Sequence, residues 1–336
     1  MKLWDKGYSI DKKIDVFTVG NDRALDEVLA RYDVLGNKAQ AVMLHKIGVL
    51  TDKELEDVTR ELDAIGKEID KGGFRIEDEF EDVHSKIEFM LTGRLGDTGK
   101  KIHTARSRND QVLLDLKLYT RAQIQELVEL TNGLFEVLIS QSNRYSEVLM
   151  PGYTHLQVAM PSSFGLWFGA YAESLADDLQ MMQAAYKVCN RNPLGSAAGY
   201  GSSFPLNRTM TTELLGFDSM DYNVVYAQMG RGKMERTVAF AMAGIAATIS
   251  KLAFDACMFN SQNFGFIKLP DQFTKPETVT VFKCSGYFHQ GVGCPRHSRQ
   301  YNDFRGFIPD KPCDFPNLDS GSYRSAAEFH HSHFIF

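Results

Sequence analysis

The chain has 336 residues, enough to bury a large core in one long or two shorter domains. Its formal charge of -6 and its pI near 5.9 argue against a nucleic-acid or membrane-surface partner, although a basic pocket can lie in an acidic protein. The five cysteines form no even, closely spaced framework, and the first residues contain no apolar export signal, so we expect a cytoplasmic protein. The longest uncharged stretch, residues 237–250, is too short to cross a bilayer and is interpreted as a buried helix.

Hydrophobic periodicity predicts helix through most of the chain as far as residue 262. Apolar residues that include Leu25 and Val28 recur at helical spacing in a helix from residue 22 to about residue 47. Thr51 and Glu54 have the spacing of a capping box, which predicts where the next helix begins.

Two shorter amphipathic helices then lead to a polar turn at Gly96. Three longer helices are predicted over residues 110–145, 164–188 and 233–259. Helices of this length and apolar character cannot be covered by one neighbour. They indicate an all-α fold, a long-helix bundle whose core is shared between subunits.

The most informative turn is HTARSRNDQ, residues 103–111, which we call the arginine motif. Arg106 and Arg108 can each offer a planar fork to a carboxylate, and Asn109 can both donate and accept hydrogen bonds. The first amides of the following helix add unpaired donors. The alternative is a solvated turn in which Ser107 caps the helix. We favour binding of a small polyanion, because a cap alone needs no pair of arginines.

A second polar turn is predicted between two long helices, at PGYTHLQ, residues 151–157. It presents Thr154, His155 and Gln157 together. A histidine in such a turn can act as a general acid or base near neutral pH, while the hydroxyl and the amide orient a substrate. The alternative is a structural turn with His155 bonded to the backbone.

Two further turns carry weaker signals. In EDVHS, residues 81–85, Asp82 is a candidate helix cap and His84 could point into a cleft, but a satisfied surface histidine is the favoured account. The glycine- and serine-rich loop 192–203 lacks the strand-then-helix setting of a nucleotide site, so we interpret it as close packing or an anion cradle. No spacing among the histidines before residue 275 resembles a zinc site, and no metal is expected.

These motifs, in their order and among long helices, resemble the argininosuccinate lyase family of the fumarase/aspartase superfamily. PLGSAAGYG and FGFIKLPDQFT, residues 264–274, extend the resemblance over about residues 1–274. The resemblance implies the long-helix bundle of that superfamily and a β-elimination that splits argininosuccinate into arginine and fumarate, in arginine biosynthesis, without a cofactor. A base removes a proton beside a carboxylate, and an acid protonates the departing guanidinium nitrogen.

The resemblance also implies roles for individual residues. His155 would be the acid/base histidine, and His84 would lie near the site. The residues implied to bind or surround the substrate are Asn109, Thr154, Arg106, Ser107, Arg108, His84 and Gln157. In the family, motifs from different subunits surround one active site, so a homotetramer is implied, with a small-molecule substrate as the partner.

The resemblance ends abruptly. After residue 274 the family has a mobile serine loop that carries the residue regarded as the catalytic base, whereas this chain has Lys-Pro-Glu-Thr at residues 275–278. The composition changes at the same point, as translation out of frame would produce; a divergent evolved tail is the alternative. The expected organisation is an N-terminal helical domain at 1–106, an incomplete central bundle at 107–274 and a non-homologous, disordered tail at 275–336.

Loss of this loop, of the last bundle helices and of the family's small C-terminal domain has consequences. We expect the chain to fold poorly, aggregate or lack catalysis. The sequence leaves two alternatives to an argininosuccinate-cleaving enzyme. One is a non-catalytic binding or structural protein of the same fold, and the other is a related fumarate-releasing lyase.

Overall fold

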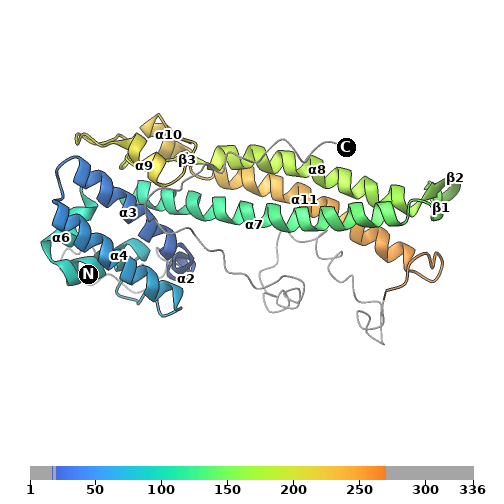
Figure 1. The fold of residues 1–336 in the computed structure, drawn as a ribbon, viewed down its shortest axis with the longest axis horizontal. Coiled ribbons are helices and arrows are strands. Elements are labelled where there is room, and N and C mark those ends of the chain that lie inside the picture. Colours follow the sequence, from blue (N-terminus) through green and yellow to red (C-terminus); the bar gives the residue numbers. More distant parts are fainter. Residues whose placement is uncertain (1–16, 18–19, 270–336) are drawn as a thin grey trace. The chain divides into compact units, whose positions relative to one another are not determined.

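The computed structural model describes residue 17 and residues 20–269, so the predictions for the tail at 275–336 lie outside the described residues. Its elements follow the chain in the order α2 (Asp22–Asp26), η1 (Glu27–Leu29), α3 (Ala30–Lys46), α4 (Asp52–Asp70), α5 (Val83–Leu95), α6 (Asp97–Lys100), η2 (Lys101–His103), α7 (Arg108–Arg144), β1 (Leu149–Thr154), β2 (Gln157–Ser163), α8 (Phe164–Cys189), β3 (Arg191–Asn192), α9 (Arg208–Leu214), β4 (Ser219–Met220), α10 (Val224–Met229) and α11 (Lys233–Phe259) (Figure 1). The long helices α7, α8 and α11 confirm the three predicted from the sequence.

The chain divides into two compact units. Of the described residues, unit 1 comprises those up to residue 134 and residues 178–241, and unit 2 comprises residues 135–177 and 242–269. The chain passes from one unit to the other three times, once within each of the long helices α7, α8 and α11.

The main core of unit 1 lies where α3, α4 and α5 pack together (Figure 1). Leu44, Leu62 and Ile87, one from each helix, are almost fully buried in one cluster. Each such side chain contributes roughly 1.5–3 kcal/mol by leaving water. The predicted capping box is confirmed, because the Thr51 hydroxyl accepts from the Glu54 amide and the Glu54 carboxylate accepts from the Thr51 amide.

The helix predicted over residues 22–47 is interrupted by the 3-10 turn η1. Leu25 and Val28, two of the apolar residues at helical spacing, are 65% and 54% exposed. The side chain of Glu27 instead accepts hydrogen bonds from Arg75 and from the Ile76 amide. Contacts with a segment distant in the sequence therefore decide the path of the chain here, and local periodicity does not record them.

In unit 2, the last part of α7, the first part of α8 and the last part of α11 lie side by side (Figure 1). Asp255 on α11 accepts hydrogen bonds from the Trp167 indole and from the Tyr171 hydroxyl of α8. Desolvation and the Asp255 carboxylate both raise the pKa of Tyr171, so this hydroxyl remains a donor. These contacts fix the relative position of α8 and α11 within the unit.

The apolar helix α11 differs from its interpretation as a buried helix. By length and composition alone it could cross a membrane, a weak criterion that core helices of soluble proteins also meet, and only 22% of its apolar window is buried. Phe240 is 69% exposed and Phe254 is 60% exposed. The prediction of burial was wrong for this chain taken alone, because the described residues do not cover this apolar surface.

Candidate functional site

The arginine motif forms the start of α7, as predicted. The Ser107 hydroxyl accepts from the Asn109 amide at 3.2 Å, and the Asp110 carboxylate accepts from the Ser107 amide at 3.0 Å. The two side chains therefore cap the helix reciprocally. Ala105, two residues before the cap, has a φ of 58°, a conformation that costs a residue with a Cβ roughly 1–2 kcal/mol.

Asp110 also holds the loop 192–203. Its second carboxylate oxygen accepts from the amides of Gly195 at 3.0 Å and Ala197 at 2.8 Å. The loop thus holds an anion, a carboxylate of the same chain. It is also closely packed, because a Cβ at Gly195 or at Gly199 would lie 2.9 Å from Arg208 or Gln228, so both interpretations are supported. Burial raises the pKa of Asp110, whereas the hydrogen bonds from these amides and from Ser107 lower it.

Arg108 is engaged within the protein. Its guanidinium reaches Glu81 at 2.9 Å, Asp82 at 3.1 Å and the Ser85 hydroxyl at 2.8 Å. Asp82 caps α5 through the Ser85 amide, which confirms its predicted role. Arg108 thus ties the start of α7 to the start of α5, and its fork is largely occupied.

Asn109 is the exposed member of the motif. Its carboxamide oxygen accepts from Arg231 at 3.1 Å, and Arg231 also donates to the Asn109 carbonyl at 3.2 Å. Arg231 lies in the turn between α10 and α11 and is itself exposed. An amide and a guanidinium therefore face solvent together at the positive end of the α7 dipole.

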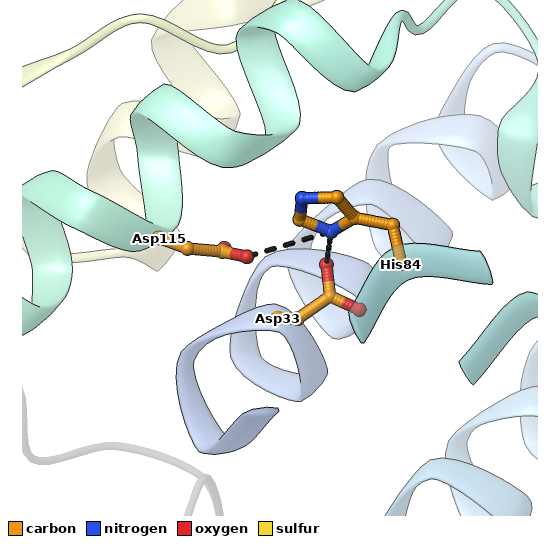
Figure 2. Close-up of side chains that lie close together, drawn as sticks. All are labelled: Asp33, His84 and Asp115. Carbon is orange, nitrogen blue, oxygen red and sulfur yellow. Dashed lines mark hydrogen bonds and ion pairs between the residues drawn. The ribbon is translucent and has the colours of Figure 1, made fainter. Parts of the chain in front are cut away.

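His84 is buried, and the expectation of a surface histidine was wrong. Only 4% of the residue is exposed, and its Nδ1 atom lies 2.8 Å from Asp33 Oδ1 and 3.6 Å from Asp115 Oδ2 (Figure 2). Both carboxylates are at most 1% exposed. Buried ionic groups need partners, and His84 is the polar group on which both acids converge.

Arg106 turns inward from the motif. Its Nη2 atom donates to Asn37 Oδ1 at 2.6 Å, while its Nε and Nη1 atoms are buried without a hydrogen-bond partner among the described residues. Arg106 lines a cavity of about 10 Å³ together with His84, His103 and Gln111. Such a cavity has room for one water molecule, not for a substrate. Burial and then the charge of Arg106 lower the pKa of His103.

Asp33, His84 and Asp115 are the one group of potential metal ligands found in the described part of the chain, with their ligand atoms within 4.8 Å of one another. One nitrogen and two carboxylates suit a divalent cation in type. However, Asp33 Oδ1 already accepts from His84 and Gln111, and Oδ2 accepts from Asn37. The donor set is therefore that of a hydrogen-bonded network, and the geometry does not fit an open metal site.

The predicted turn at 151–157 is a β-hairpin, so helix is not continuous in this region. Strands β1 and β2 pair antiparallel, with Thr154 opposite Gln157, and His155 and Leu156 form the tip. Both tip residues have positive φ, 52° and 60°, as in the type I′ turn that joins tightly paired strands. Thr154, His155 and Gln157 are all exposed at this tip in unit 2.

The structure thus brings the predicted residues together in two groups. His84, Arg106, Ser107, Arg108 and Asn109 gather in unit 1, and Thr154, His155 and Gln157 gather in unit 2. Residues that bind the first group together, but were not singled out in the sequence, are Asp33, Asn37, Asp115 and Arg231. A signal for the buried pair existed, because Asp33 and Asn37 stand one helical turn apart on α3.

Comparison with known proteins identifies the family. The model of a lyase family matches residues 10–276. Argininosuccinate lyase of Parabacteroides distasonis is 74% identical over 282 residues, and that of Bacteroides thetaiotaomicron is 68% identical. Each alignment covers 84% of this chain and 63% of the relative, so the chain spans less than two thirds of these proteins.

A solved structure of EDDS lyase in complex with formate matches with a TM-score of 0.69 and 25% identity, over 81% of this chain and 54% of that chain. The all-α, long-helix fold expected from the sequence is confirmed. Because the family model matches most of the length of this chain, the chain belongs to the lyase family.

Proposed function

We propose that the chain is an argininosuccinate lyase polypeptide, a carbon-nitrogen lyase that forms arginine and fumarate without a cofactor. The observation that carries the proposal is 74% identity to a curated argininosuccinate lyase over 84% of the chain. The proposed reaction is a β-elimination. A base takes the proton beside a carboxylate, its electron pair forms the new carbon-carbon double bond, and the carbon-nitrogen bond breaks as an acid protonates the departing guanidinium.

The proposed site must bind a substrate with several carboxylates. Asn109 is exposed at the start of α7, with Arg231 beside it, so a carboxylate there can accept hydrogen bonds from both side chains and is stabilised by the positive end of the helix dipole. We propose that Asn109 contacts the substrate directly, with Ser107 beside it. Arg106, Arg108 and His84 are already engaged inside the protein, so their proposed contribution is to hold this surface in shape.

His155 is proposed to exchange the proton with the leaving group. The residue is exposed at a two-residue turn, with Thr154 and Gln157 paired on either side to orient a substrate. The tight two-residue turn limits where His155 can lie, which suits this role because a misplaced acid loses efficiency steeply.

We propose that the site is assembled from several copies of the chain, as a homotetramer in the cytoplasm. The exposed apolar side chains of α11, such as Phe240 and Phe254, offer surface for such an assembly. The segment at which the family carries its base, residues 275–278, lies outside the described residues. Binding and turnover are therefore to be measured separately.

The test uses the full chain with argininosuccinate. Isothermal titration measures the affinity, and ultraviolet absorbance of fumarate measures turnover. His155→Asn is expected to lower any turnover by about a hundredfold or more while leaving the affinity nearly unchanged, since the residue transfers a proton. Light scattering of the same sample reports the oligomeric state.

Competition with adenylosuccinate, malate and aspartate separates the alternatives. Tight preference for one of these over argininosuccinate would favour a related fumarate-releasing lyase. Binding of argininosuccinate with no fumarate release would favour a non-catalytic protein of the same fold. Absence of binding to any of the four would refute the proposed function.

A further inference from the structure

We infer that Asp33 is a positioning residue of the substrate site, whose buried carboxylate sets the geometry of the arginine motif; the inference rests on the function proposed above. Three side-chain donors reach this carboxylate. His84 Nδ1 lies at 2.8 Å and Gln111 Nε2 at 2.6 Å from Oδ1, and Asn37 Nδ2 lies at 2.8 Å from Oδ2. The donors come from helices α5, α7 and α3, so one residue joins all three helices around the motif.

Asn37 extends this control to the motif's first arginine. While its Nδ2 donates to Asp33, its Oδ1 accepts from Arg106 Nη2 at 2.6 Å. An asparagine side chain has one donor end and one acceptor end. The charge on Asp33 therefore fixes which way Asn37 points, and that orientation gives Arg106 its acceptor.

The other end of the motif is fixed by the same carboxylate, through its other oxygen. Gln111 is 3% exposed, and its amide nitrogen donates to Asp33 Oδ1 while Asn109 lies two residues earlier on the first turn of α7. Arg106 and Gln111 thus lie on either side of Ser107 and Asn109, the residues proposed to face the substrate. A shift of Arg106 or of Gln111 moves the Asn109 side chain and the first turn of α7.

The neighbouring acid does not share this role. Burial and then the charge of Asp33 raise the pKa of Asp115 well above its usual value. Burial acts in the same direction on Asp33, but His84, its hydrogen bonds and Arg106 outweigh it, and the pKa of Asp33 is lowered. The negative charge of the pair therefore resides on Asp33, the carboxylate that all three donors reach.

The decisive variant is Asp33→Asn, which keeps the size of the side chain. Its amide end must face either Asn37 Nδ2 or the donors of His84 and Gln111, so at least one donor loses its acceptor. If the Asn37 side-chain amide rotated by half a turn to present its oxygen to residue 33, its nitrogen would face Arg106, which would then lose its acceptor. The matched control is Asp221→Asn, because Asp221 is another buried carboxylate of unit 1, 4% exposed against 1% for Asp33. Its carboxylate accepts from Lys117 at 2.6 Å and has no described hydrogen bond to residues 103–111.

Two measurements on the full-length variants separate positioning from simple destabilisation. Amide hydrogen exchange of residues 103–111 is expected to accelerate by about tenfold or more in Asp33→Asn, the effect of losing a buried hydrogen bond to a charged group. Asp221→Asn is expected to lower the melting temperature but to leave exchange in that segment unchanged. The affinity for argininosuccinate should fall by a similar factor in Asp33→Asn alone.

Each outcome decides one question. Wild-type exchange of residues 103–111 in Asp33→Asn overturns the inference, whether or not the chain binds argininosuccinate. Faster exchange with unchanged affinity also overturns it, because the geometry of the motif would then not matter for the substrate. Faster exchange in a chain that binds no argininosuccinate even as wild type refutes the proposed function, while the control of the motif by Asp33 stands.

Discussion

Arg106 Nη2 donates to Asn37 Oδ1 at 2.6 Å and thereby joins the arginine motif to a helix 69 residues earlier in the chain. Asn37 is 2% exposed, so loss of its oxygen leaves a guanidinium nitrogen buried without an acceptor. We expect Asn37→Leu, which keeps the branched shape of the side chain, to lower the free energy of unfolding by roughly 3 kcal/mol. Urea unfolding measures this change.

The control for Asn37→Leu is the same substitution at an exposed position, Asn143→Leu on α7. A surface change of this kind should alter the free energy of unfolding by less than about 0.5 kcal/mol. Equal effects of the two substitutions would show that the contact between Asn37 and Arg106 does not stabilise the fold.

The raised pKa of Asp115 predicts a pH-dependent effect of Asp115→Asn. In the folded chain burial keeps this carboxyl protonated, whereas in the unfolded chain it ionises above about pH 3.9. Because only the unfolded state ionises over this range, the free energy of unfolding of the wild type falls as pH rises. Asparagine cannot ionise, so Asp115→Asn lacks this loss of stability. Relative to the wild type, Asp115→Asn should gain about 1.4 kcal/mol per pH unit above pH 4, up to the folded pKa.

Denaturant unfolding of both proteins at several pH values between 4 and 7 measures that difference. A difference that does not change with pH would mean that Asp115 is ionised in the folded chain. In that case the network would hold two buried negative charges beside His84, and a bound cation would become the better explanation of the cluster.

Local features of the sequence predicted local structure well. The long helices follow from apolar periodicity, and the caps at Thr51, Asp82 and Ser107 follow from residue types a few positions apart. The hairpin was missed because Pro151 and Gly152 indicate a turn, although the chain continues in strand pairing through both.

The interior of the site could not be predicted in this way. His84 and Asp33 are 51 residues apart, and Asp110 meets the loop amides 85 and 87 residues later. Nothing in either neighbourhood marks these pairs, because they form only when the helices pack. The motifs located the functional region, and packing decided which of its polar groups face solvent.

Arg108→Lys tests whether this arginine braces the fold or binds the substrate. Lysine can replace one ion pair with Glu81 or Asp82, but it cannot also donate to Ser85 from a second nitrogen. We expect a loss of stability of about 1 kcal/mol, because the site is only partly buried, with at most a small change in affinity for argininosuccinate. A large loss of affinity at unchanged stability would instead place Arg108 against the substrate.

Leu156 at the hairpin tip offers the last test. Its φ of 60° is unfavourable for a leucine, and its side chain is 71% exposed, so little packing compensates for the strain. Leu156→Gly should raise the free energy of unfolding by about 1 kcal/mol, less the entropy that glycine adds to the unfolded chain. Val158→Gly is the matched control, because Val158 is also 71% exposed but lies in strand β2 without a positive φ. It should lower the free energy of unfolding by roughly 0.5–1 kcal/mol, and a loss in both variants would show that the tip of the hairpin is not strained.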